Sequence, residues 1–486
     1  SAGVSYRNYI GGHWVESDDG ATLVVRDPAD DTVVGEVPLC GAAETRRAIA
    51  AAAASLPGRP ATEPATRAER VSVLSRLMDE RRVELAALLT REQGKPLAES
   101  EGEIDYARSY LDTAVLEFRR MRRERSLDAE ETGKDVFVEA APVGVVGVIT
   151  PWNFPLAMLT KKLGPAGCLG CPMVVKPAED TPLTTLLLAE LAEQAGFPPG
   201  AFNVVTGSPE AIGGELMSDP RVRLVSFTGS TETGRLLVRA ADRTLTRLLL
   251  ELGGHAPFIL TESASIEAAL DGLVTAKFRN GGQTCVCPNR ILVPESLHDR
   301  FVDGLAARLD RLVVGRGDRP GVDLGPLVND AAIAGVEAQV RDAVGKGARV
   351  VRGGKRLALP GLADRFFAPT LLDGCTSEMD CFRIETFGPV CPVRTYRSLE
   401  EAIVIANELP AGLAAYVWTG EREEGVALAR RLECGIVGIN DPSPVTAFSP
   451  FGGVKQSGWG HEGGAAVLGE YAPPKTYSMG RFQGDP

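Results

Sequence analysis

The sequence predicts an α/β protein whose parallel sheets carry helices on both faces. From about residue 143, short runs rich in β-branched residues alternate with segments whose apolar residues have helical spacing. Strands that alternate with helices in this way are typical of parallel sheets. The chain has 486 residues, too many for one ordinary core, so we expect two or three domains.

The first half of the chain is expected to begin with helices and then to form a sheet. Apolar residues at helical spacing predict helices at 48–54, 67–91 and 99–120. Short β-rich runs, separated by helical segments at 184–194 and 210–217, predict strands at 143–149, 173–175, 202–205 and 224–227. This order indicates a nucleotide-binding architecture.

A second α/β unit is predicted between residues 253 and 433. Helices are expected near 266–278 and 297–312, and strands near 291–293 and 414–418.

Composition argues against several classes of protein. Hydrophobic residues make up 44% and charged residues 24%, the balance of a globular enzyme. The net charge of −12 makes nucleic acid or an anionic membrane an unexpected partner. Because there is no apolar run of about 18 residues and no signal-peptide pattern at the start, we expect a cytoplasmic protein without a membrane span.

The cysteines fit a reducing environment. Nine cysteines at irregular spacing favour free thiols over a disulfide framework. Cys168 and Cys171 form a C-x-x-C pair, but no second pair or nearby histidine accompanies them, so we expect no metal site.

Cys285 is the strongest candidate for a catalytic residue. It stands in Phe-Arg-Asn-Gly-Gly-Gln-Thr-Cys-Val-Cys, residues 278–287. A thiolate attacks carbonyl carbon well, and Gly281-Gly282 allows main-chain N–H groups to approach the oxyanion that forms. A buried cysteine with only a packing role is the common alternative. Cys287 is close enough in sequence to suggest a peroxide-dependent disulfide with Cys285, although this spacing is strained.

Two further polar residues stand at the ends of predicted strands. Asn153, in Pro-Trp-Asn-Phe-Pro, follows the strand at 143–149, and its amide can donate to an oxyanion. Its alternative role is to form a turn. Glu251 ends an apolar run before two glycines, where desolvation would raise its pKa as a general base requires. Alternatively, Glu251 lies at the end of its strand and contacts only solvent or a lysine.

Residues 224–234 read as a strand, a glycine turn and the start of a helix. The free N–H groups and the positive end of such a helix suit a pyrophosphate. The segment is not G-x-G-x-x-G, so the usual dinucleotide fingerprint is absent.

Seven motifs occur in one order along the chain: P-W-N-F-P, K-P-A-E, F-T-G-S-T-E-x-G, L-E-L-G-G, F-R-N-x-G-Q-T-C, E-T-F-G-P and P-F-G-G-x-K-x-S-G. This ordered set resembles that of the NAD(P)-dependent aldehyde dehydrogenase superfamily. The resemblance covers essentially the whole chain, and Cys285-Val286-Cys287 is most similar to the succinate-semialdehyde dehydrogenase branch.

The resemblance implies catalytic roles for four residues. Cys285 would form a thiohemiacetal, and Asn153 together with the backbone N–H of Cys285 would form the oxyanion hole. Glu251 would activate the water that hydrolyses the thioester, which implies a free acid as product. Lys162 corresponds to the lysine that the family has near its active site.

The resemblance also implies a nicotinamide cofactor, NAD in preference to NADP. Lys176 and Glu179 match contacts to the adenosine ribose, where a carboxylate would repel a 2′-phosphate. The remaining matches to the dinucleotide groove and the nicotinamide ribose are Thr150, Trp152, Phe227, Gly229, Ser230, Glu385 and Phe387.

Three structural units follow from the resemblance. Residues 1–124 and 143–251 would form a Rossmann-type NAD-binding domain, and residues 252–440 an α/β catalytic domain. Segments 125–142 and 470–486 would form a small β oligomerisation ribbon, with extended stretches at 135–140 and 475–479. We therefore expect a homodimer or a homotetramer.

The positions that would bind the substrate depart in part from the branch. Arg279 and Lys161 stand where the family holds a substrate anion, but the branch usually has Arg at 161 and Ser near Val445, and His255 replaces the usual Asn or Lys. We expect a small anionic aldehyde such as succinic semialdehyde, with glutaric semialdehyde or phosphonoacetaldehyde as alternatives. Both cations could instead pair with structural acids.

A non-catalytic binding protein and a thiol hydrolase are less favoured, because the catalytic and cofactor motifs are present.

Overall fold

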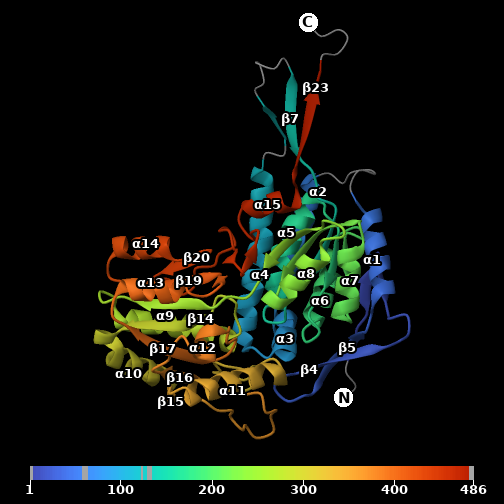
Figure 1. Cartoon of the computed structure of the whole chain (residues 1–486). Coiled ribbons are helices and arrows are strands. Elements are labelled where there is room, and N and C mark those ends of the chain that lie inside the picture. The colour runs from blue at the N-terminus through green and yellow to red at the C-terminus, as the bar shows by residue number, and fades with distance from the viewer. Residues whose placement is uncertain (1–3, 57–63, 122–123, 128–133, 481–486) are drawn as a thin grey trace.

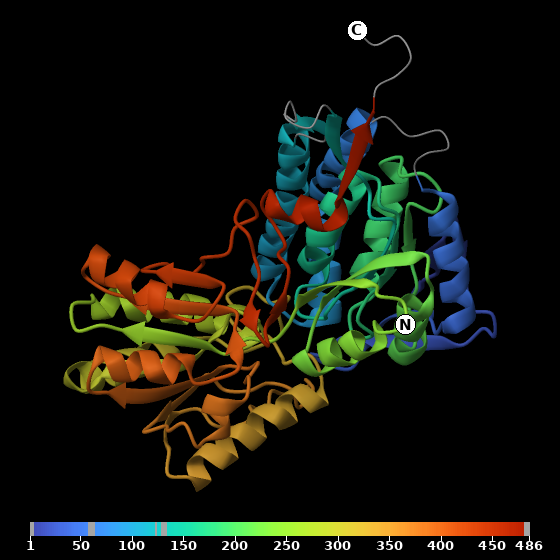
Figure 2. The same ribbon diagram turned by 45° about the horizontal axis from the view of Figure 1, so that its top comes forward.

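The structure is a computed structural model that describes residues 4–56, 64–121, 124–127 and 134–480. Two α/β units lie side by side, each built around one sheet, and a short ribbon projects from the first unit (Figures 1 and 2). The α/β class predicted from the sequence is confirmed. The division at residues 124, 251 and 440 stays a prediction.

The first sheet has a parallel centre with antiparallel edges. Its strands, in spatial order, are β22 (Gly458–Trp459), β12 (Arg247–Glu251), β11 (Val222–Thr228), β8 (Val145–Ile149), β9 (Met173–Lys176), β10 (Phe202–Val204), β2 (Asn8–Ile10) and β3 (His13–Val15). The run from β12 to β10 is parallel, whereas β22, β2 and β3 pair antiparallel. The carboxyl ends of β8, β11 and β12 therefore meet at one edge.

Helices cover both faces of the first sheet, because successive strand residues point to opposite sides. Val146 and Val148 pack in one core cluster, while Val145 and Val174 pack in the other. The first face is covered by α2 (Pro64–Glu80), α3 (Arg82–Gln93), α4 (Leu97–Arg120), α5 (Pro155–Leu169) and α6 (Leu183–Gln194). The second face is covered by α1 (Ala42–Ala54), α7 (Pro209–Ser218) and α8 (Thr231–Ala240).

The single helix predicted at 67–91 is wrong. The chain forms α2 and α3 instead, with a break at Arg81, whose φ of −101° and ψ of 19° lie outside the helical range. Buried residues continue at helical spacing on both sides of the break, from Met78 in α2 to Leu85 in α3. Periodicity alone therefore does not reveal a break of one residue.

The second sheet is parallel apart from one edge. Its strands, in spatial order, are β15 (Arg349–Arg352), β16 (Thr370–Asp373), β17 (Val390–Tyr396), β14 (Pro288–Pro294), β13 (Ala256–Leu260), β19 (Ala414–Trp418) and β20 (Ile436–Ile439). One face packs against α9 (Ile266–Phe278) and α10 (His298–Leu309). The other packs against α11 (Asp330–Gly345), α12 (Asp380–Arg383), α13 (Leu399–Asn407) and α14 (Arg422–Arg431).

The projecting ribbon is antiparallel and joins distant parts of the chain. It consists of β6 (Glu124–Leu127), β7 (Asp135–Ala140) and β23 (Pro474–Met479), with β7 in the middle (Figure 1). The extended stretches predicted at 135–140 and 475–479 thus form neighbouring strands, and the rings of Phe137 and Tyr477 stack 4.5 Å apart across them.

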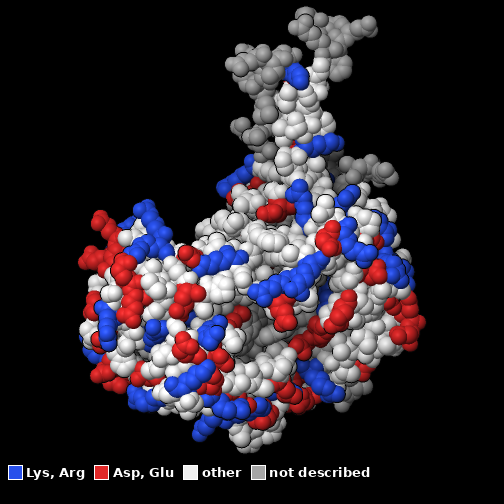
Figure 3. Space-filling model, in the orientation of Figure 1, with Lys and Arg blue, Asp and Glu red and all other residues white. Residues whose placement is uncertain are grey.

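Several small elements complete the described chain. They are a sheet of β1 (Val4–Ser5), β5 (Val33–Pro38) and β4 (Thr22–Arg26), a pair of β18 (Ala411–Gly412) and β21 (Val454–Lys455), and helix α15 (Ala466–Tyr471). On the face shown in Figure 3, acidic and basic residues are interspersed. Within the described residues, no helix has the length and apolar character needed to cross a bilayer.

Candidate active site

Cys285 lies in a tight loop between α9 and β14. The loop begins with a 3-10 turn, Arg279–Gly282, in which Asn280, Gly281 and Gly282 all have positive φ values, of 51°, 63° and 80°. Position 282 must be glycine, because a Cβ atom there would lie 2.1 Å from the carbonyl oxygen of Gly388. The glycines noted in the sequence therefore let two loops approach each other closely beside Cys285.

Cys285 is half-buried and lines a cavity of about 220 Å³. Asn153, Glu251, Glu385 and Phe387 line the same cavity, as the sequence predicts for one site. Burial raises the pKa of the Cys285 thiol to about 12, and the charge of Lys161 opposes this shift. Lys161 therefore favours the thiolate that attacks a carbonyl.

Asn153 follows β8, and hydrogen bonds fix its amide. The side-chain oxygen accepts from the backbone N–H of Phe154 at 3.0 Å, and the side-chain nitrogen donates to the carbonyl of Gln283 at 3.1 Å. The amide is thus orientated with its nitrogen towards the loop that carries Cys285. One of its two N–H groups remains to donate to a substrate oxygen.

Glu251 ends β12 and is only 2% exposed. Neither of its carboxylate oxygens has a hydrogen-bond partner among the described residues. Burial raises the pKa of Glu251 well above its usual range, and Glu462 raises it further, while Lys161 and Lys162 act in the opposite direction. A buried carboxylate with a raised pKa beside a nucleophile can serve as a general base.

Lys162 does not line the cavity with Cys285. Its ammonium group donates to the hydroxyl of Thr228 at 2.6 Å and pairs with the buried carboxylate of Glu462. The sequence analysis missed Glu462, because nothing in its neighbourhood distinguishes it from a surface glutamate. Lys162 is therefore part of a buried charge cluster with Glu462, and both charges act on Glu251.

A longer groove continues from this cavity along the carboxyl edge of the first sheet. It has a volume of about 570 Å³ and shares Pro151, Trp152 and residues 228–230 with the Cys285 cavity. The predicted cofactor residues Thr150, Trp152, Lys176, Glu179, Phe227, Gly229 and Ser230 all line it. Ligand sites in parallel sheets lie at this edge.

The groove has the features that a dinucleotide requires. Helix α8 begins there, with Ser230 capping the backbone N–H of Thr233 at 3.2 Å, so its positive end suits a pyrophosphate. At the end of the groove where the sequence predicts the adenosine ribose, Lys176 and Glu179 form an ion pair at 3.1 Å, and Glu179 remains 41% exposed.

At the other end of the site, Glu385 accepts from the backbone N–H of Gly254 at 3.2 Å, and burial raises its pKa to about 8. A Cβ atom at Gly253 would lie 2.6 Å from this carboxylate. Phe387, with a φ of 53°, packs edge-on against Trp152 with 5.5 Å between ring centres. The pair Gly253-Gly254 thus allows Glu385 to approach the end of β12.

The predicted substrate cations lie beyond this cavity, and neither lines it. Lys161 is 2% exposed, and its ammonium group lies 3.8 Å from the ring centre of Phe451, 4.9 Å from Tyr110 and 5.4 Å from Tyr106. Among the described residues it has no hydrogen-bond partner. The exposed guanidinium of Arg279 lies 4.7 Å from Phe154 and 5.5 Å from Tyr106. Both cations therefore contact Tyr106. No ion pair within 4 Å joins either to an acid in the described part of the chain, although Glu462 acts on Lys161, and Arg279 on Glu99, through charge alone.

Two other thiol features lie apart from the groove. Cys287 is buried, and its thiol donates to the carbonyl of Lys277 at 3.4 Å, so a disulfide with Cys285 would need a backbone shift and stays a hypothesis. Cys171 donates to the carbonyl of Tyr471 at 3.3 Å. No cluster of three or more metal-ligating side chains occurs among the described residues.

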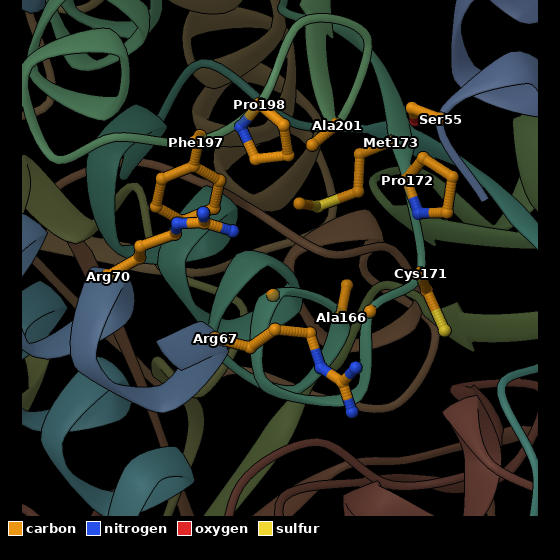
Figure 4. A pocket seen from close by; sticks show the side chains of 12 residues that line it. Ser55, Arg67, Arg70, Ala166, Cys171, Pro172, Met173, Phe197, Pro198 and Ala201 are labelled. Carbon is orange, nitrogen blue, oxygen red and sulfur yellow. The ribbon is translucent and has the colours of Figure 1, made fainter. Parts of the chain in front are cut away.

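Cys171 lines a different pocket, at the amino end of β9. Arg67 and Arg70 of α2 border it together with Phe197 and Pro198 (Figure 4). Its volume of about 40 Å³ is far below the several hundred Å³ typical of ligand sites. This pocket is therefore too small to hold a dinucleotide.

Comparison with known proteins agrees with the geometry. Residues 14–477 match the description "Aldehyde dehydrogenase family". This chain belongs to that family. The chain is 45% identical to the glutarate-semialdehyde dehydrogenase of Pseudomonas aeruginosa, over 97% of each chain. It is 43% identical to the NADP(+)-linked succinate-semialdehyde dehydrogenase GabD of Escherichia coli, also over 97% of each.

A solved structure shows the same architecture. The crystal structure of the succinate-semialdehyde dehydrogenase from Burkholderia pseudomallei matches with a TM-score of 0.95 and 46% identity, over 98% of each chain. The resemblance to this branch of the aldehyde dehydrogenases is confirmed. The protein is an oxidoreductase that acts on aldehydes.

Proposed function

We propose that this aldehyde dehydrogenase oxidises a small aldehyde with an anionic far end to the free acid, with NAD as the hydride acceptor. The observation that carries the proposal is the convergence of Cys285, Asn153 and Glu251 on one cavity that opens into the groove. The first is a nucleophile, the second an oxyanion donor and the third a base.

Cys285 begins the reaction. Its sulfur attacks the aldehyde carbon, and the carbonyl oxygen gains negative charge. The free N–H of the Asn153 amide and the backbone N–H of Cys285 are the donors that would stabilise this oxygen. Before the attack the thiol loses its proton to solvent, and the charge of Lys161 assists this loss because it opposes the rise in the pKa of Cys285 that burial causes.

Bound in the groove, the nicotinamide dinucleotide would supply the acceptor for the hydride that the thiohemiacetal loses in becoming a thioester. Lys176 and Glu179 would hold its adenosine ribose, and Glu385 its nicotinamide ribose.

Glu251 completes the cycle. Its carboxylate takes a proton from water, the hydroxide oxygen attacks the thioester carbon, and the Cys285 thiolate leaves as the acid forms. The location of Glu251 in the cavity that holds Cys285 supports a free acid as the product.

The positive charges of Lys161 and Arg279, which lie beyond the cavity, support an anionic substrate. Lys161 and Arg279 both contact Tyr106, and the ammonium group of the buried Lys161 has no hydrogen-bond partner among the described residues. Relatives named for the semialdehydes of succinate and glutarate support this substrate class. Phosphonoacetaldehyde is the second candidate, because the compact charge of Lys161 is less selective for planar carboxylates than an arginine.

A panel of aldehydes tests the proposal. We expect NADH formation to be faster with succinic semialdehyde, glutaric semialdehyde or phosphonoacetaldehyde than with neutral aldehydes of equal length. Arg279→Ala should lower kcat/KM for the preferred acidic aldehyde by about 2 kcal/mol and leave the neutral aldehydes nearly unchanged.

Two controls accompany the panel. Cys285→Ala should abolish oxidation while NAD still binds. Arg352 lies on β15 and forms an exposed ion pair with Asp310, so Arg352→Ala should behave as wild type. If Arg279→Ala lowers kcat/KM equally for acidic and neutral aldehydes, Arg279 is not part of a site for the substrate anion.

A further inference from the structure

We infer that Asn280 and the buried Lys95–Glu103 pair are positioning residues, which hold the oxyanion-binding amide of Asn153 against the loop that carries Cys285. This inference rests on the proposed roles of Asn153 and Cys285. Three steps of the hydrogen-bond network lead to it.

The first step is the main-chain carbonyl of Asn153, which accepts two hydrogen bonds from side chains. Lys95 donates its ammonium group at 2.8 Å, and Asn280 donates its amide at 3.0 Å. These donors come from the loop after α3 and from the turn after α9, so the two α/β units meet on this one carbonyl. Fixing the carbonyl restricts the backbone from which the Asn153 amide projects.

The second step is the ion pair of Lys95 and Glu103, whose side chains are fully buried. Glu103 accepts from the backbone N–H groups of Leu156 at 2.9 Å and Ala157 at 3.2 Å, in the first turn of α5. The ammonium group of Lys95 also lies 4.0 Å from the ring centre of Phe154. The pair therefore holds the turn from Asn153 to the start of α5.

Through these two bonds Glu103 caps the start of α5. A second capping glutamate in the fold shows that Lys95 does more than balance the charge of Glu103. Glu92 caps α6 in the same way, accepting from the backbone N–H groups of Leu183 at 2.7 Å and Thr184 at 2.9 Å. Among the described residues, Glu92 forms no ion pair, and the hydroxyl of Thr184 bonds to it instead. A buried glutamate thus caps a helix here without a lysine, and the distinguishing contact of Lys95 is the Asn153 carbonyl.

The third step is Asn280, which also binds the loop of Cys285. Its carbonyl accepts from the backbone N–H of Gln283 at 3.1 Å and from the Gln283 side chain at 2.9 Å. The carbonyl of Gln283 in turn accepts from the Asn153 amide at 3.1 Å. Glu99 anchors Asn280 by accepting from its backbone N–H at 2.8 Å. Asn280 therefore bonds both to the main chain of Asn153 and to Gln283, in the loop that carries Cys285.

The conformation of Asn280 permits a clean variant. Its φ of 51° is a left-handed conformation that glycine adopts without strain, so Asn280→Gly removes the amide donor and preserves the turn. Asn440 provides a matched control, because it also has a φ of 51° and donates its amide to a carbonyl, that of Thr419 at 2.8 Å. Asn440 does not line the cavity.

Two reagents separate positioning from general damage. With 4-nitrophenyl acetate, the Cys285 sulfur attacks the ester carbonyl, an oxyanion forms and 4-nitrophenolate leaves. With iodoacetamide, the same sulfur displaces iodide and no oxyanion forms. The ratio of the two rates with Cys285 therefore reports on the oxyanion hole, without any cofactor. Cys285→Ala measures the background for each reagent.

We expect Asn280→Gly to lower the ester rate by about 10- to 100-fold while iodoacetamide alkylation and the melting temperature stay close to wild type. Asn440→Gly should leave the ratio unchanged. The double variant Lys95→Met/Glu103→Gln replaces the buried ion pair with two uncharged side chains, and the amide oxygen of the glutamine can still cap α5. It should also lower the ratio of the ester rate to the alkylation rate.

Other outcomes contradict the inference. If either variant keeps the wild-type ratio, or if both of its rates fall together, the residues changed in that variant do not position Asn153. If wild type itself neither acylates with the ester nor oxidises aldehydes, the proposed function fails instead.

Discussion

Glu251 shows how burial sets chemistry at the scale of one residue. Burial raises its pKa, Glu462 adds to the shift, and Lys161 and Lys162 limit it. Because a general base acts only when deprotonated, hydrolysis of the thioester should speed up with rising pH through a pKa above the usual carboxylate range.

Glu251→Gln tests this role. The variant should give a burst of NADH of about one equivalent per site, then turnover slowed by at least about 100-fold and without the pH dependence of wild type. Stopped-flow absorbance across pH measures both phases. Steady-state turnover equal to wild type would assign the base to another residue.

Glu179 gives a second prediction at the same scale. Its carboxylate pairs with Lys176 at 3.1 Å, remains 41% exposed and lines the groove, where it would repel a 2′-phosphate. We expect NAD to be preferred, although the related enzyme GabD is NADP(+)-linked. Glu179→Ser should shift the ratio of kcat/KM for NAD over NADP towards NADP by about tenfold or more. Equal efficiency of wild type with both cofactors would contradict this.

At the scale of elements, the packing of α4 against α5 determines which side chains surround Lys161. Helix α5 carries Lys161 and Lys162, and α4 carries Tyr106 and Tyr110. The two helices approach closely at Gly164, where a Cβ atom would lie 2.9 Å from that of Ala114 and 3.2 Å from the carbonyl oxygen of Tyr110. The contact between Lys161 and the tyrosines depends on this approach.

Gly164→Ala should therefore destabilise the protein by about 1–3 kcal/mol through overpacking. Gly335→Ala is the matched control in the interior of α11, where no atom lies within 4 Å of the added Cβ, so it should stabilise by about 0.5–1 kcal/mol. Thermal unfolding of both variants measures the difference. An unchanged melting temperature in Gly164→Ala would show that the helices can separate at little cost.

At the scale of the whole molecule, the ribbon of β6, β7 and β23 projects from the first unit (Figure 1). In the described sheet, β23 pairs with β7 on one side only, so an edge of unpaired backbone groups remains for another chain. We propose that this ribbon joins subunits into a homodimer or homotetramer.

A chain that ends at Pro473 tests this proposal, because it lacks β23. Sedimentation velocity should give a smaller assembly for the truncated chain than for the full chain, while circular dichroism stays similar. The same assembly size for both chains would place the subunit interface elsewhere.

The sequence by itself determined the class of the fold and the main chemical groups. Cys285, Asn153 and Glu251 stand in glycine-rich turns or at strand ends, and these signals depend on a few neighbouring residues. Alternating strands and helices are equally local, which is why β8, β9 and α9 were predicted nearly in place. The break at Arg81 was not predicted, because a single turn residue leaves the apolar spacing on both sides intact.

Only the tertiary structure decided which groups face one another. Lys162 pairs with Glu462, 300 residues away in the chain, rather than lining the cavity beside Cys285. Lys161 lies among aromatic rings from α4 and from Phe451, and Lys95 and Asn280 meet on the carbonyl of Asn153. Burial and charge partners set a pKa or fix an amide, and these partners come from elements that only packing brings together.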